Sequence, residues 1–178
     1  MKRVHLYLAV AGAAVLAIAA GVTAQSGASA AAPTYQAHRG IAHLYAQINL
    51  PAGVWVDTPL VVALPVAATY DLDADVRGRI SGTPGFNSFI TARLWNVTAN
   101  TVVPDSARII NQIIDYHGGN GATGSNQTAP ISELINVSEP TTIRLQALRV
   151  DAGGAASIAQ IYSDANGYTS LRYQEVFP

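Results

Sequence analysis

The sequence predicts an all-β fold: an antiparallel β-sandwich or barrel of about eight or nine strands. Three observations support this prediction. Apolar and polar residues alternate with a period of two in most segments after residue 40, which is typical of strands that bury one face. Clusters of Gly, Pro, Asn and Asp separate these segments at nearly regular intervals. No segment after residue 40 shows the 3.6-residue period of an amphipathic helix.

Three strands are predicted in the first part of the domain. Residues 41–48 alternate around Leu44 and Ile48, and residues 55–62 form an apolar run rich in branched side chains. The alternation is clearest in residues 69–77, where the even positions are apolar and the odd positions from 71 onward are charged. A segment of this kind buries one face and leaves the other in water, as in an antiparallel sheet.

Five further strands are predicted in the second part, again from alternating or branched apolar side chains bounded by turn signals. They cover residues 89–97, 108–114, 141–150, 157–163 and 170–177. Between them, the segment from Gly118 to Thr128 is rich in Gly, Asn, Ser and Thr. Its low apolar content predicts a mobile surface loop.

The first 30 residues have the layout of a secretory signal peptide. Lys2 and Arg3 precede an apolar run from Leu6 to Ala20, and Ala28-Ser29-Ala30 provides a cleavage tripeptide. We therefore expect a signal peptide at 1–30, a flexible lead at 31–40 and a single domain at 41–178. The alternative is that the apolar run remains as an N-terminal membrane anchor, since its length approaches that of a spanning helix.

The composition after residue 30 excludes several function classes. Eight arginines and 11 carboxylates give a net charge of −3, which argues against a nucleic-acid binder or a polybasic membrane-surface protein. Cysteine is absent, so a cysteine nucleophile and cysteine metal sites are excluded. A secreted domain without disulfides must be held by core packing, and 148 residues suffice for that.

Four segments resemble a known family when they are taken in order: Leu64–Leu72, Thr91–Asn96, Thr141–Ala147 and Asn166–Leu171. They are similar to the "LPAGTY" strand entry, the following strand, the late strand and the final "G-x-T-x-L" turn of C1q/TNF-like domains in bacterial secreted and phage proteins. The resemblance covers about residues 41–176. It implies a jelly roll of two antiparallel sheets, usually a non-enzymatic trimer that binds proteins or sugars.

Three acidic residues have the 1-3-5 spacing of a calcium loop: Asp71, Asp73 and Asp75. The loop motif then fails, because Val76 stands at the glycine position and Gly82 at the position of the final glutamate. On a strand the carboxylates line one face about 7 Å apart. We expect a solvated face balanced by Arg77 and Arg79, with weak Ca²⁺ binding as the alternative and no other cofactor.

The glycine-rich segment after His117 is the predicted binding surface. His117-Gly118-Gly119 matches the oxyanion segment of esterases, but the chain has no G-x-S-x-G nucleophile motif. We therefore expect an exposed loop that binds a partner, with His117, Asn120 and Asn126 as its candidate residues. No catalytic residue is predicted, and the protein is expected not to be an enzyme.

Aromatic residues offer a second candidate binding surface: Trp55, Trp95, Tyr162, Tyr168, Tyr173 and Phe177. They could stack on sugars, but packing in the core or at a subunit interface is commoner for aromatics on strands, and we expect the latter.

Together these observations predict a secreted jelly-roll domain that binds a partner or forms part of a surface assembly. It is expected to associate with itself as a homotrimer, through outer faces at residues 60–64 and 108–114 that carry few charges, and to meet a protein or glycan at a cell surface. Two alternatives remain: a monomeric carbohydrate-binding module, and a secreted hydrolase in which His38 or His117 meets a nucleophile.

Overall fold

The computed structural model describes residues 36–176. All regular secondary structure in this range is β-strand. The strands are β1 (Arg39–His43), β2 (Ile48–Asn49), β3 (Val56–Leu64), β4 (Ala68–Gly82), β5 (Phe86–Asn96), β6 (Thr101–Val102), β7 (Arg108–Asp115), β8 (Thr123–Val137), β9 (Thr141–Gly153), β10 (Ile158–Ile161) and β11 (Ser170–Val176). No helix in this range is long and apolar enough to cross a membrane. The predicted signal peptide at 1–30 lies outside the described residues.

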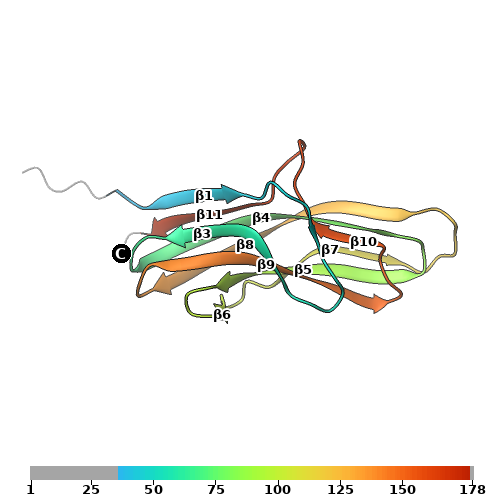
Figure 1. Ribbon diagram of the computed structural model, residues 1–178, viewed down its shortest axis with the longest axis horizontal. Coiled ribbons are helices and arrows are strands. Elements are labelled where there is room, and N and C mark those ends of the chain that lie inside the picture. Colours follow the sequence, from blue (N-terminus) through green and yellow to red (C-terminus); the bar gives the residue numbers. More distant parts are fainter. Residues whose placement is uncertain (1–35, 177–178) are drawn as a thin grey trace, which may run out of the picture. The chain divides into compact units, whose positions relative to one another are not determined.

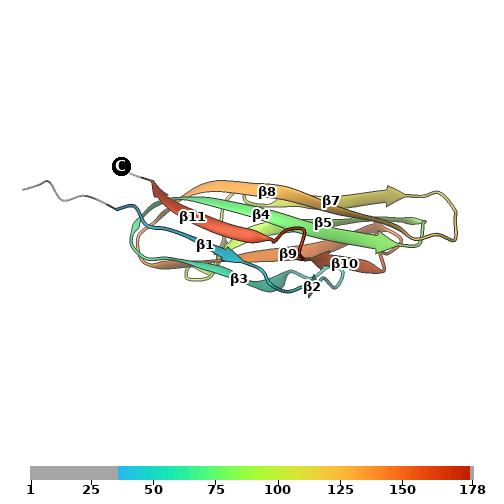
Figure 2. The same ribbon diagram turned by 90° about the horizontal axis from the view of Figure 1, so that it is seen from above.

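The strands form two antiparallel sheets that lie face to face, seen as an upper and a lower layer in Figure 1 and from above in Figure 2. Sheet A contains β1, β2, β4, β8, β10 and β11, and sheet B contains β3, β5, β6, β7 and β9. The side chains between the sheets form one hydrophobic cluster. The predicted all-β sandwich is therefore confirmed.

Three of the jelly-roll strands are each broken into two short pieces. When the pieces are joined, the number of strands agrees with the predicted eight or nine. β10 and β11 pair with successive parts of β4, and β6 and β7 pair with successive parts of β5. β1 and β2 pair with β11 and β10 in the same way. With each of these pairs taken as one strand, the eight strands have the orders 1-8-3-6 and 2-7-4-5. Successive strands thus alternate between the two sheets, except for the fourth and fifth, which pair in one sheet as in a jelly roll.

The predicted alternation corresponds to the buried face of each main strand. Tyr70, Leu72, Ala74 and Val76 of β4 are buried, while the aspartates between them face outward. In β9, the side chains of 143, 145 and 147 enter the same core. Of the outer face predicted at residues 60–64, Leu60, Val62 and Leu64 lie in the core. Only Val61 and Ala63 face outward there.

The loop predicted at 118–128 is wrong from Thr123 onward. β8 begins at Thr123 and pairs with β4 without interruption, from Gly82↔Thr123 to Ala68↔Val137. β8 lies at the edge of sheet A, and its first half carries Gly, Ser, Asn, Gln and Thr and buries no large apolar side chain. An edge strand of this kind lacks the alternating apolar signal by which strands are recognised. Long-range pairing with β4 holds it instead.

The domain also begins earlier than predicted. β1 starts at Arg39, two residues before the predicted boundary at 41, because Arg39 and Gly40 pair with Gln174 and Tyr173 of β11. Immediately before the strand, the Glu175 amide donates to the His38 carbonyl at 2.7 Å.

Candidate functional site

The three predicted aspartates lie side by side on the outer face of sheet A, as expected. Arg172 of β11 is their cationic partner, 3.1 Å from Asp75 and 3.9 Å from Asp73. The Ser132 hydroxyl of β8 donates to Asp73 at 2.6 Å. The expected partners Arg77 and Arg79 bond elsewhere, because Arg77 turns toward Asp164 and Arg79 donates to Asn126. That expectation was therefore wrong about the partner, which comes from another strand.

Among residues 36–176 there is no group of three or more His, Asp or Glu side chains placed to hold a metal ion. The carboxylates of Asp73 and Asp75 share Arg172, which occupies the position where a cation would bind. Weak calcium binding by Asp71, Asp73 and Asp75 stays a prediction.

A shallow groove of about 450 Å³ crosses this outer face. Its lining residues come from β1, β4 and β11: Arg39, Gly40, Ile41, Asp71, Asp73, Arg172, Tyr173 and Gln174. Strand register places Arg39, Gln174 and Asp71 in one row across the sheet. The next row contains Ile41, Arg172 and Asp73. Sequence reasoning found the aspartates but not the groove, because its two walls are far apart in the chain.

Three aromatic rings gather beyond the groove. His43 at the end of β1 stands one row further along the strand than Ile41. Its ring centroid lies 5.9 Å from that of Tyr168 and 6.2 Å from that of Tyr45, and the two tyrosine rings are 5.5 Å apart. Tyr45 is 78% exposed and Tyr168 47% exposed.

The segment that carries Tyr168 is held by the side chain of Arg77. This segment, between β10 and β11, rises above the upper layer in Figure 1. The Arg77 guanidinium donates to Asp164 at 2.8 Å, to the Tyr162 hydroxyl at 2.9 Å, and to the Gly167 carbonyl. The Leu44 amide donates to the Thr169 carbonyl at 2.8 Å. This last bond ties the neighbours of Tyr45 and Tyr168 to each other.

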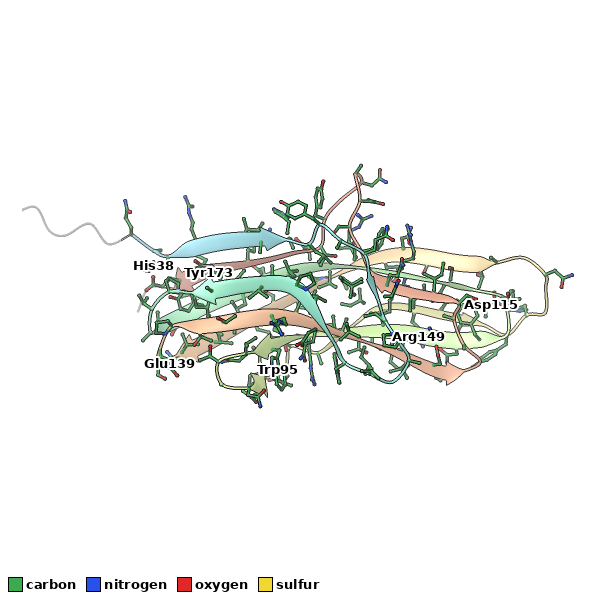
Figure 3. The ribbon with its side chains drawn as sticks, viewed as in Figure 1. His38, Trp95, Asp115, Glu139, Arg149 and Tyr173 are labelled. Carbon is green, nitrogen blue, oxygen red and sulfur yellow. The ribbon has the colours of Figure 1, made fainter. Side chains whose placement is uncertain are left out.

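The candidate binding residues of the β7–β8 connection do not form one site. His117 and Asn120 lie on the connection itself, and the His117 side chain is fully exposed beside Asp115, which Figure 3 labels near one end of the molecule. Asn126 belongs to β8 and accepts from the Arg79 Nε atom at 3.2 Å. Within the part of the chain that the structure describes, no hydrogen bond or ion pair joins these three side chains. Their role in binding stays a prediction.

The arrangement expected of a hydrolase is not formed by the described histidines. The His38 Nδ1 atom lies 2.7 Å from a Glu175 carboxylate oxygen, and the nearest partner of His117 is likewise a carboxylate, that of Asp115. No hydrogen bond joins a histidine to a serine or threonine hydroxyl in residues 36–176. The geometry therefore gives no support to the hydrolase alternative.

The predicted aromatic set does not share one surface. Tyr162 is buried beneath the Arg77 and Arg79 guanidinium groups, and Tyr173 packs inside against Tyr70. Trp55 and Trp95 lie on the outer face of sheet B, and Figure 3 shows Trp95 on the lower layer. Phe177 lies outside the described residues. A single platform made of all these rings is excluded, because strand alternation sends them to different faces.

On the outer face of sheet B, the two tryptophans pack on one arginine. The Arg93 guanidinium carbon lies 3.8 Å from the ring centroid of Trp55 and 5.1 Å from that of Trp95. Its Nε atom donates to Gln146 at 2.8 Å, and Gln146 donates to Asp57 at 2.7 Å. Burial lowers the pKa of Arg93, and the charge of Asp57 partly opposes this.

Apolar side chains continue from this cluster across sheet B. Register places Leu148, Thr91 and Ile109 in one row, and Val150, Phe89 and Gln112 in the next. The edge strand β7 and the residue after it expose their apolar side chains strongly: Ile109 56%, Ile114 61% and Tyr116 63%. We call this surface, from Trp55 just before β3 to Ile114 on β7, the sheet B face.

Comparisons with known proteins give only distant likenesses. No protein-family model matches the sequence, and no curated protein matches it significantly. Among solved structures, the VP2 subviral particle of infectious bursal disease virus is similar with a TM-score of 0.47 and 11% identity, over 79% of this chain and 33% of that chain. The T13 particle of the same virus gives a TM-score of 0.46 and 15% identity, over 78% and 31% of the two chains.

This chain thus spans about a third of the length of the viral chains that it matches. With identities of 15% or less and TM-scores below 0.5, the likeness assigns neither a family nor a function.

Proposed function

We propose that this chain is a secreted, non-enzymatic jelly-roll domain that associates with itself through the sheet B face. The observation that carries the proposal is the group of exposed apolar and aromatic side chains there, with Ile109 and Ile114 more than half exposed. Large apolar patches on soluble domains mark interaction sites, and tryptophan and arginine are the residues that most often dominate binding energy at protein interfaces. The stack of Arg93 on Trp55 and Trp95 lies within this patch.

The size and charge of the sheet B face suit a second copy as its partner. Four neighbouring strands, each about nine residues long, cover roughly 30 Å by 19 Å. This area is of the same order as the ~800 Å² that each partner buries in a standard interface. Asp57 pairs with Arg144 at 2.5 Å, so the face carries little net charge. In a closed trimer, one part of this face would contact a different part of the same face on the next copy. The copies can meet in this way without strong repulsion between like charges.

A homotrimer is the proposed assembly, in keeping with the resemblance to C1q/TNF-like domains and with the frequency of closed, symmetric oligomers. Light scattering coupled to size exclusion tests it on the secreted protein. We expect a trimer for the unmodified chain, and a monomer for the double variant Ile109→Asp, Ile114→Asp. The control variant Leu134→Asp places one aspartate at an equally exposed apolar position on sheet A and should remain trimeric. A monomeric unmodified protein at micromolar concentration contradicts the proposal.

Secretion is the second part of the proposal, and it rests on the signal-peptide pattern at 1–30. Mass spectrometry of the protein recovered outside the producing cells should give a mature N-terminus at Ala31. An uncleaved chain recovered with membranes would favour the anchor alternative instead.

A further inference from the structure

The groove on the outer face of sheet A and the aromatic rings beyond it form a second surface, separate from the sheet B face. We propose that this surface binds a carbohydrate, a short oligosaccharide that lies along β1 from Arg39 to Tyr45. The groove, the two charged side chains in it that lack a partner among the described residues, and the exposed rings carry this inference independently of self-association.

Two charged groups in the groove have no partner among the described residues. The side chains of Arg39 and Asp71 make no hydrogen bond or ion pair within residues 36–176, although both residues line the groove. They lie in one row with Gln174 between them, so their strands are about 10 Å apart. At that spacing they do not neutralise each other directly. A ligand must therefore offer donors to the carboxylate and acceptors to the guanidinium.

Hydroxyl groups meet both requirements at once. A hydroxyl donates one hydrogen bond and accepts others, whereas a carboxylate only accepts and a guanidinium only donates. A sugar presents neighbouring hydroxyls without net charge, so it can bind Asp71 and Arg39 together. A simple cation or anion would gain from one of the two groups and be repelled by the other. The side-chain amide of Gln174 lies between them and can both donate and accept hydrogen bonds.

The aromatic rings provide the apolar half of the site. Sugars have C–H faces that pack on aromatic rings, whose faces carry partial negative charge. Tyr45 and Tyr168 offer exposed rings next to His43, which ends β1 one row beyond Ile41 of the groove. Successive rows on a strand are about 7 Å apart. The polar groups and the rings therefore follow one line along which an extended oligosaccharide can lie.

The site is also prepared in advance of binding. Arg77 holds the segment around Tyr168 through Asp164, Tyr162 and Gly167, and the Leu44–Thr169 bond fixes Tyr45 beside it. Ordering exposed side chains on binding costs affinity, and a rigid arrangement avoids much of that cost. In the groove, Arg172 is likewise held in place by the carboxylates of Asp73 and Asp75.

Calorimetric titration of the secreted protein with four hexasaccharides tests the proposal: cellohexaose, xylohexaose, mannohexaose and chitohexaose. We expect at least one to bind with a dissociation constant between micromolar and millimolar. Tyr168→Ala should weaken that binding at least tenfold, and Asp71→Asn at least threefold. The control Tyr116→Ala removes a tyrosine that is more exposed than Tyr168 and lies elsewhere, and it should leave binding unchanged.

Failure of all four sugars to bind at millimolar concentration overturns the proposal, even if a protein partner is later found for this surface. Binding that survives both Tyr168→Ala and Tyr45→Ala also overturns it. Circular dichroism of each variant separates loss of the site from loss of the fold. The double variant Ile109→Asp, Ile114→Asp should still bind sugar, so this inference and the proposed self-association can fail independently.

Discussion

The outer faces of the two sheets differ, although their inner faces are alike. Sheet A carries rows of aspartate and arginine with a groove between them, whereas sheet B carries tryptophan, phenylalanine and isoleucine around a single stacked arginine. Both sheets place a continuous set of apolar side chains in the shared core. The comparison shows that the inward-facing side chains of each strand build the fold. The outward-facing side chains are free to specify what each face binds.

The way arginine is used on the two faces makes the same point. Arg172 on sheet A is half exposed and reaches two carboxylates through water-accessible ion pairs. Arg93 on sheet B lies against indole rings and loses part of its solvation. Exposed ion pairs contribute little to stability, whereas a cation held over aromatic rings contributes more when it is desolvated. The two faces should therefore respond differently to the same substitution.

The largest effect is expected in the core, where the two sheets should behave alike. Leu72 of β4 and Leu94 of β5 are both fully buried. Replacing either by alanine leaves a cavity and should lower the free energy of unfolding by about 2–5 kcal/mol. Urea denaturation of Leu72→Ala and Leu94→Ala measures this. A cost below about 1 kcal/mol for one of them would show that its sheet is not packed as described.

Next in size is the contrast between the two arginines. Arg93→Ala removes the contact with Trp55 and Trp95 and the hydrogen bond to Gln146, so we expect a loss of about 1–3 kcal/mol. Arg172→Ala should change stability by no more than about 0.5 kcal/mol. Both are measured by urea denaturation at the same salt concentration. Equal costs for the two variants would remove the proposed difference between the faces.

A third prediction concerns Asp151, a carboxylate that points inward from β9 rather than onto either face. Burial raises the pKa of Asp151, but hydrogen bonds from Arg149 and Ser88 and the charge of Arg149 outweigh it, so the pKa lies below its usual value. Such a group stabilises the fold above its unfolded pKa, near 3.9. That contribution is lost as the pH falls through the folded pKa.

Asp151→Asn should therefore destabilise the protein at pH 7 by roughly 1–2 kcal/mol, and the difference from the unmodified protein should shrink below about pH 4. Thermal unfolding at several pH values between 7 and 3 measures it. A difference that stays constant over this range would contradict the assigned pKa direction.

The smallest effect on stability is expected for the groove. Asp71 is exposed and has no partner among the described residues, so Asp71→Asn should alter the free energy of unfolding by less than about 0.5 kcal/mol. The same variant should weaken sugar binding, which separates a binding role from a structural one. A large loss of stability would show that the carboxylate supports the fold of sheet A.

Strands with strong alternation were predictable because burial of one face acts on each segment separately. β4 and β9 show this, since every even position from 70 to 76 and every odd position from 143 to 147 is buried as the pattern indicates. β8 was not predictable, because its first half buries nothing large and depends on pairing with β4. The partner of the aspartates was missed for the same reason, since Arg172 reaches them only through the β4–β11 register.

The sequence by itself determined the fold class, the buried face of the main strands and the absence of cysteine chemistry, because composition and local period decide these. Tertiary structure alone decided which strands are neighbours. It brought Arg39 and Asp71 into one row on either side of Gln174, Tyr45 beside Tyr168 and Trp55 onto Arg93. The physical reason is that strand pairing joins residues far apart in the chain, and a one-residue change of register sends a side chain to the other face.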